Sequence, residues 1–134
     1  MDYYVFMHKK RDNIKIKNNE VLIDYLKSLK FPVYDKKHNL SIYLDDNRAR
    51  SNQSRYEHIV RDDHELVIDD LKTLFKELDT TARFKKDKVR KDTYNCYVRR
   101  SKQSNQFIKM CIAIDRNDKH KGKVKTIFIT RNIK

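Results

Sequence analysis

A short polar segment, Ser54 to His64, gathers residue types that can move protons. It places His58, His64, Arg55 and Arg61, together with a tyrosine, within eleven residues. On a helix Arg55 and His58 lie one turn apart on the same face. His64 is expected to open the next helix, where unpaired backbone N–H groups favour neutral imidazole over imidazolium. A neutral histidine can take a proton, and a histidine beside a phosphate can stay charged and give one. This segment therefore predicts acid–base chemistry.

Metal-free cleavage of RNA needs those two roles. A base removes the proton of a 2′-hydroxyl, the oxygen attacks the adjacent phosphorus, and an acid protonates the leaving 5′-oxygen. A cation such as Arg55, Arg61 or Arg99 must offset the charge that builds on the phosphate oxygens. The alternative interpretation is that both histidines are solvated residues on a polar surface.

The net charge of the chain lies entirely in its C-terminal part. Arg83–Lys134 carries 17 Lys+Arg against 4 Asp+Glu, whereas Met1–Ala82 carries 15 of each. A one-sided positive field concentrates polyanions near a surface and speeds their arrival. The asymmetry therefore favours nucleic acid as the partner over a basic face that serves only solubility.

Hydrophobic periodicity predicts helices in the first half of the chain. Spacings of three and four predict helices at Asn18–Leu29, Ser54–Val60 and His64–Leu78, the last with Asp62 and Glu65 as a capping box. Short strands are expected at Tyr3–Met7, Val33–Tyr34 and Leu40–Leu44, and a loop at Asp45–Ser54.

After Asp79 the apolar residues alternate, which is typical of strands. Strands are expected at 93–99, 108–115 and 126–130, with a fourth at Ala82–Lys86, and the short connections between them suit antiparallel hairpins. We predict an α+β fold with helices packed on one face of a twisted antiparallel sheet of about four strands. One domain spans residues 1–134, with 1–53 as an N-terminal α/β elaboration. The opposite face, which carries Tyr97, Arg99, Lys109, Thr126 and Thr130, is expected to meet RNA.

Several function classes are excluded by composition. A single glycine, Gly122, rules out a P-loop or a dinucleotide-binding turn. The histidines and cysteines lack zinc spacing, so no metal or cofactor is expected. Cys96 and Cys111 are expected to be reduced and buried. The chain has no apolar run that could span a membrane and its N-terminus has no signal-peptide pattern, so we expect a cytoplasmic protein without a membrane partner.

The order Arg55, His58 and His64, an amphipathic helix, and then strands ending in Val124–Thr130 resembles the barnase–EndoU–colicin–RelE-like (BECR-fold) ribonuclease superfamily, above all its phage-associated branches. The resemblance covers roughly Arg55 to Thr130. It implies a small, metal-independent ribonuclease, often a toxin of a mobile element, with RNA and an acidic antitoxin or inhibitor protein as partners. It implies catalytic roles for His58, His64, Arg55, Tyr97 and Thr130, and the residues expected to bind RNA are Arg61, Arg99, Arg100, Lys109, Lys125 and Thr126.

Two other functions stay open at this point. The basic sheet would suffice for a nucleic-acid-binding protein without catalysis, whose affinity would fall steeply with salt. The chain could also be a phage or mobile-element inhibitor whose basic face meets an acidic host protein.

Overall fold

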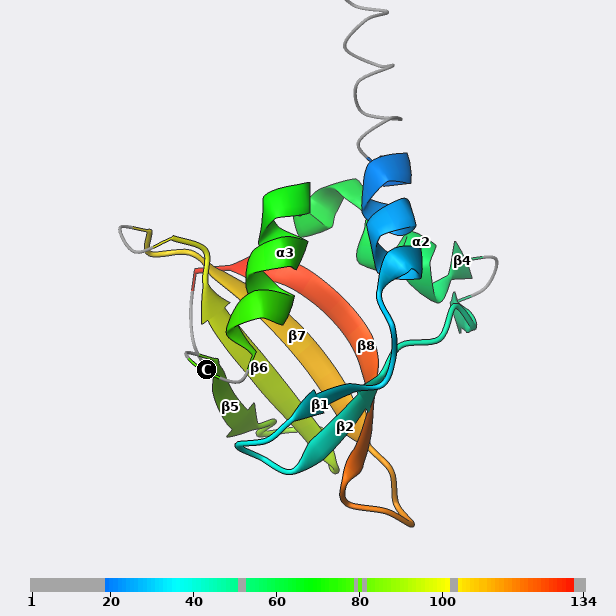
Figure 1. The fold of residues 1–134 in the computed structure, drawn as a ribbon, viewed down its shortest axis with the longest axis vertical. Helices are drawn as coiled ribbons and strands as arrows, with labels where there is room; N and C mark the ends of the chain where they lie inside the picture. Colours follow the sequence, from blue (N-terminus) through cyan, green and yellow to red (C-terminus); the bar gives the residue numbers. More distant parts are fainter. Residues whose placement is uncertain (1–18, 51–52, 79, 81, 102–103, 132–134) are drawn as a thin grey trace, which may run out of the picture.

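The computed structural model describes residues 19–50, 53–78, 80, 82–101 and 104–131 (Figure 1). The strand expected at Tyr3–Met7 lies outside these residues, and the first expected helix is present over residues 19–28. The elements that follow are β1 (Val33–Asp35), β2 (Leu40–Tyr43), β3 (Arg48–Arg50), β4 (Gln53–Ser54), α2 (Arg55–Ile59), the 3-10 helix η1 (Asp62–His64), α3 (Ile68–Glu77), β5 (Arg83–Lys86), β6 (Thr93–Arg99), β7 (Phe107–Ile114) and β8 (Lys121–Thr130).

The main sheet has six strands in the order β1-β2-β8-β7-β6-β5. The α+β class and the antiparallel pairing of the four C-terminal strands are confirmed. The sheet is nevertheless larger than expected and mixed, because β2 joins it parallel to β8. The ten-residue strand β8 would otherwise leave a long unpaired edge, and the β1–β2 hairpin covers its first part at Lys121–Lys123. The N-terminal strands are thus an integral part of this sheet.

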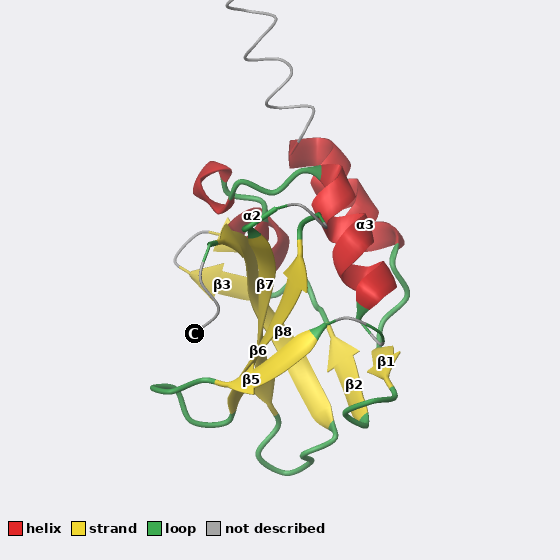
Figure 2. Cartoon of the chain, turned by 90° about the vertical axis from the view of Figure 1, so that its left-hand side faces the viewer, coloured by secondary structure: helices red, strands yellow, loops and turns green. Residues whose placement is uncertain are grey.

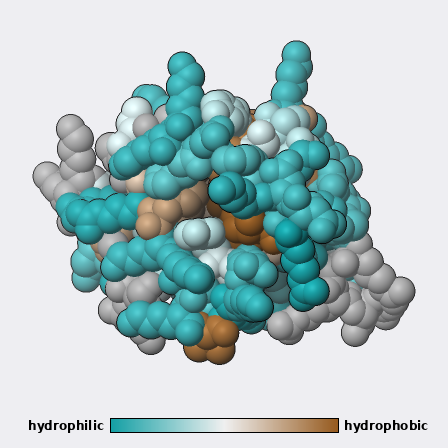
Figure 3. All heavy atoms as spheres, turned by 90° about the horizontal axis from the view of Figure 1, so that it is seen from below, coloured by the Kyte–Doolittle hydropathy of each residue, from teal (hydrophilic) through white to brown (hydrophobic). Residues whose placement is uncertain are grey.

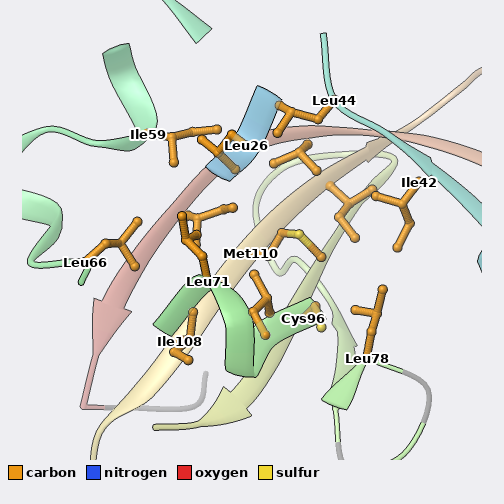
Figure 4. Packing of buried hydrophobic residues seen from close by; sticks show 14 of the residues in the cluster. Leu26, Ile42, Leu44, Ile59, Leu66, Leu71, Leu78, Cys96, Ile108 and Met110 are labelled. Carbon is orange, nitrogen blue, oxygen red and sulfur yellow. The ribbon is translucent and has the colours of Figure 1, made fainter. Parts of the chain in front are cut away.

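The hydrophobic core lies between one face of the sheet and two helices, residues 19–28 and α3 (Figure 2). Leu26 and Leu71 point from these helices toward Cys96, Ile108 and Met110 on the strands, and all five side chains are fully buried (Figure 4). Burying one such side chain contributes about 1.5–3 kcal/mol. The alternate residues of the same strands face away from this core and form what we call the outer face of the sheet.

Helix α2 begins where the sequence indicates. The hydroxyl of Ser54 accepts the N–H of Glu57, and the Glu57 carboxylate accepts the N–H of Ser54. The preceding segment, expected as a loop, instead contains the small β3–β4 hairpin. Asp46 accepts the backbone N–H of Tyr56 at 2.9 Å, which ties this hairpin region to the first turn of α2.

Helix α3 starts later than expected, at Ile68 instead of His64. The Asp70 carboxylate accepts the N–H of Val67 at 2.9 Å, so Asp70 caps this helix and the expected box of Asp62 and Glu65 does not form. His64 therefore ends η1 and lies outside the first turn of α3. The expectation that His64 would open the next helix is therefore wrong.

Within the described residues, no helix is both long and apolar enough to cross a membrane. The lower end of the molecule, around the β7–β8 hairpin, presents mostly hydrophilic side chains with small apolar areas between them (Figure 3). Lys119, Lys121 and Lys123 are exposed at this end.

Candidate functional site

The floor of the candidate site is the outer face of β6, β7 and β8. Cross-strand register aligns Asn95, Cys111 and Thr126 in one row. Tyr97, Lys109 and Phe128 form the next row. Side chains that are opposite each other on neighbouring strands share a face. The two rows therefore form a continuous surface on the side of the sheet away from α3.

One wall of the site is built by α2 and η1, which pack against the part of β8 that β2 leaves uncovered. Arg55 donates from Nη1 to the carbonyl oxygen of Lys125 at 2.7 Å. Lys125 is the extra residue of a β-bulge, since Cys111 pairs with Thr126 while Ile112 pairs with Val124. A bulge re-aims a side chain and interrupts the hydrogen bonding of an edge. Arg55 thereby fixes α2 to the sheet at this irregular point.

The imidazole rings of His58 and His64 lie on this wall, with centroids 5.3 Å apart and planes at 88°. The Nδ1 of His64 is 2.8 Å from the carbonyl oxygen of Ile59, and the ring lies 5.8 Å from that of Phe128. A carbonyl only accepts hydrogen bonds, so Nδ1 of His64 is the donor. A proton exchanged with a ligand must therefore pass through Nε2.

The opposite wall is the turn between β5 and β6. Asp87 accepts the N–H groups of Val89 and Arg90 and the side-chain amide of Asn95. The Arg90 and Asn95 hydrogen bonds lead the causes that lower the pKa of the Asp87 carboxyl to about 2. The same contacts fold the turn over the outer face and bring Arg90 to the site.

The two walls and the floor enclose a cavity of about 480 Å³. Among the described residues no carboxylate lines it, so the charged groups of its described lining are cationic. We call it the histidine cavity. Its lining residues are Arg55, His58, Arg61, His64, Arg90, Thr93, Cys111, Ala113, Lys125, Thr126 and Phe128.

Polar groups of the histidine cavity are desolvated to different degrees: the Lys125 side chain is exposed, and that of Arg55 is half-buried. Burial lowers the pKa of Lys125, and the neighbouring charges of Arg55 and Lys123 lower it further. Burial also lowers the pKa of Arg55. The hydroxyl oxygen of Thr126 is buried and has no hydrogen-bond partner among the described residues. Crowded cations are well suited to bind an anion.

The structure brings together six of the predicted residues: His58, His64, Arg55, Arg61, Lys125 and Thr126 all line the histidine cavity. Arg61 also forms a salt bridge with Asp63 at 2.8 Å. Lys109 lies beside the cavity, with Nζ 5.4 Å from the ring centroid of Phe128.

The other predicted residues lie elsewhere. Tyr97 is only 1% exposed, with Lys109 Nζ 5.6 Å from its ring centroid, so the expectation of an accessible tyrosine on the outer face is wrong. Thr130, opposite Phe107, and Arg99 do not line the histidine cavity. Arg100 binds the buried Asp70 through both carboxylate oxygens.

Sequence reasoning missed two cavity residues of interest, Arg90 and Phe128. Arg90 comes from a turn that is rich in charged residues, where nothing in the sequence distinguishes one cation from the next. Phe128 belongs to a predicted strand, and its alternation with Ile127 and Ile129, which puts it on the same face as Thr126, was the available signal.

No group of three or more potential metal ligands occurs among the described residues. Both cysteines are free and buried, as expected. Burial raises the pKa of Cys96 to about 12 and also raises that of Cys111. Cys96 faces the core and Cys111 the outer face.

Comparisons of this chain with protein-family models, with curated proteins and with solved structures gave no match.

Proposed function

We propose that this protein is a metal-independent endoribonuclease that cleaves RNA by attack of a 2′-hydroxyl on the adjacent phosphodiester. One observation carries the proposal: the rings of His58 and His64 lie 5.3 Å apart at a cavity whose described lining holds four cationic side chains, of which Arg61 is paired with Asp63, and no carboxylate. Two imidazoles at this separation can serve the two oxygens on either side of one phosphorus.

In this proposal one imidazole accepts the proton of the 2′-hydroxyl and the other gives a proton to the leaving 5′-oxygen. His64 acts through Nε2, since its Nδ1 donates to the Ile59 carbonyl. That hydrogen bond also fixes the orientation of the ring, as a catalytic histidine requires. His58 follows one turn after Arg55 on α2 and faces the same cavity.

The cations of the cavity stabilise the charge that develops on the non-bridging phosphate oxygens. Arg55 and Lys125 reach the phosphate from the β8 side, and Arg90 reaches it from the β5–β6 turn. Donors that are already in place in a partly desolvated site stabilise a transition state without reorganising.

The resemblance of Arg55, His58 and His64 to the BECR-fold ribonucleases extends the proposal. A ribonuclease of this kind would act in the cytoplasm as a toxin or effector of a phage or mobile element. Its inhibitor would be an acidic protein that covers the histidine cavity, because a carboxylate-rich surface complements four cations.

The test is incubation of the purified protein with RNA in excess EDTA, followed by analysis of the product ends. The expected products carry 2′,3′-cyclic or 3′-phosphate ends. His58→Ala and His64→Ala should each slow cleavage by roughly 10²- to 10⁴-fold. His120→Ala is the matched control, because His120 is exposed at the other end of β8 and contacts the Asn39 carbonyl. Cleavage that requires added Mg²⁺, or that survives loss of both histidines, would refute the mechanism.

A nucleic-acid-binding protein without catalysis is the second candidate, favoured by the cations that line the histidine cavity. It predicts salt-sensitive binding of RNA or DNA with no cleavage of any substrate. The same incubation therefore separates the two functions.

A further inference from the structure

A second cavity, of about 500 Å³, lies at the β5 edge of the sheet, where residues of α3 meet residues of β5, β6 and β7. Its lining includes Arg83, Arg99, Phe107 and Tyr97. None of these four residues lines the histidine cavity. The proposed chemistry therefore leaves this second cavity without a role.

The second cavity combines exposed cations with an aromatic ring. Arg83 and Arg99 are exposed, and the guanidinium of Arg99 lies 5.7 Å from the ring centroid of Phe107. Glu77 offsets one positive charge at the α3 side, whereas Arg100 is held by Asp70. Guanidinium groups beside aromatic rings are the groups that bind phosphates and stack bases of single-stranded nucleic acid.

A single row of side chains connects the two cavities. Register places Arg83, Tyr97, Lys109 and Phe128 side by side on β5, β6, β7 and β8. Tyr97 lines the second cavity and Phe128 lines the histidine cavity. Lys109 Nζ lies 5.6 Å from one ring centroid and 5.4 Å from the other. Three strand spacings of about 4.8 Å separate Arg83 from Phe128, or ~14 Å.

We propose that the second cavity is a distal subsite that binds the phosphate of an RNA strand several nucleotides from the bond being cleaved, with Lys109 bridging the two cavities. This inference rests on the proposed function, because the histidine cavity must bind the part of the same RNA strand that is cleaved. A separation of ~14 Å is too long for neighbouring phosphates of one strand and suits a short stretch of single-stranded RNA. The subsite contributes binding energy from groups remote from the reaction.

The test compares a dinucleotide with an RNA of about 12 nucleotides, a length typical of single-strand sites. The double variant Arg83→Gln, Arg99→Gln should bind the longer RNA roughly tenfold more weakly and bind the dinucleotide with unchanged affinity. The slope of log affinity against log salt for the longer RNA should fall by about 1.4, at 0.7 per phosphate contact. Lys27→Gln with Lys30→Gln is the matched control, because it removes the same charge from exposed positions on the helical side. This control should leave both affinities unchanged.

Binding is measured by fluorescence anisotropy in the His58→Ala, His64→Ala background, so that cleavage does not interfere. If the native protein cleaves no RNA, the proposed function fails, and the length-dependent affinity still reports on the subsite. Equal losses for the dinucleotide and the longer RNA, or equal losses in the lysine control, would overturn the subsite. Binding of an acidic polypeptide with no binding of either RNA would also overturn it.

Discussion

Replacement of Arg100 by alanine is expected to destabilise the fold by about 3 kcal/mol. Nε and Nη2 donate to the two carboxylate oxygens of Asp70 at 2.9 and 3.0 Å. Nη1 donates to the Gln106 side chain at 3.0 Å, and Nη2 reaches the Glu65 carbonyl at 3.3 Å. These contacts fasten the first turn of α3 to the end of β6. Arg100 is therefore expected to act on stability, although the sequence suggested a role in binding RNA.

The magnitude follows from burial. Removing one partner of a buried ion pair costs about 3–5 kcal/mol, because the other charge stays buried. Asp70 is 4% exposed but Arg100 is 26% exposed, so water can reach part of the vacated space and the lower figure applies. One kcal/mol shifts the Tm of a chain of this size by roughly 3–5 °C, so Tm should fall by ~10 °C. Arg99→Ala, which removes an exposed guanidinium stacked on Phe107, should cost under ~1 kcal/mol.

The assay is urea unfolding followed by circular dichroism, with the m-value checked for constancy. Asp70→Asn is added alone and together with Arg100→Ala to complete a double-mutant cycle. Residues in direct contact couple by about 0.5–3 kcal/mol, so the cycle should show a coupling of that size. Additive effects, or an Arg100→Ala variant as stable as Arg99→Ala, would refute the reasoning.

Three further predictions concern titratable groups. Because the pKa of Asp87 is lowered in the folded state, its ionised carboxylate stabilises the fold above the ordinary aspartate pKa, and this stabilisation is lost as pH falls through about 2. Asp87→Asn should therefore reduce stability at pH 7 and make stability decline less between pH 4 and 2. Urea melts across that pH range measure both effects. Because the pKa of Lys125 is lowered in the folded state, its positive charge opposes folding at pH values below that pKa. Lys125→Met should therefore leave Tm at pH 7 unchanged or raised and reduce the rate of RNA cleavage roughly tenfold or more. A lower Tm would contradict this. Cys96 and Cys111 should resist a thiol reagent in the native protein and react on unfolding, and rapid native labelling would contradict their burial.

The strands of the C-terminal half of the fold were predictable because their apolar residues recur at every second position. Alternation of Ile108, Met110 and Ile112 with Lys109, Cys111 and Ala113 indicates a strand with one buried face, and short connections leave antiparallel hairpins as the simple solution. The long apolar stripe around Leu71 and Leu74 likewise identifies the helix that covers this sheet.

The start of α3 was not predictable from the same pattern. Asp62 and Asp70 both offer a capping carboxylate, and the choice between them depends on Arg100, thirty residues away, which holds Asp70 in place. The parallel pairing of β2 with β8 is similarly a tertiary effect, because nothing local to residues 40–43 indicates which edge the strand joins.

The candidate site was predictable in part. The spacing of Arg55 and His58 predicts one face of a helix, whereas His64 was expected to open the next helix. In the structure Arg55 and His58 lie on α2, His64 ends η1, and all three line the histidine cavity. Arg90 could not be identified as a cavity residue from the sequence, because its position at the histidine cavity depends on the hydrogen bonds that fold the β5–β6 turn around Asp87. Tyr97 was misjudged because alternation predicts which face a side chain occupies and not whether the neighbouring strands cover it.

The most direct test of the central claim uses an RNA oligonucleotide in which a single ribose at the cleaved position is replaced by deoxyribose. If His58 and His64 promote attack of the 2′-oxygen on the adjacent phosphodiester, cleavage at the substituted position should disappear in EDTA while neighbouring positions are still cleaved. Undiminished cleavage at the deoxyribose would show that the attacking oxygen comes from elsewhere, and the account of the histidine cavity would be wrong.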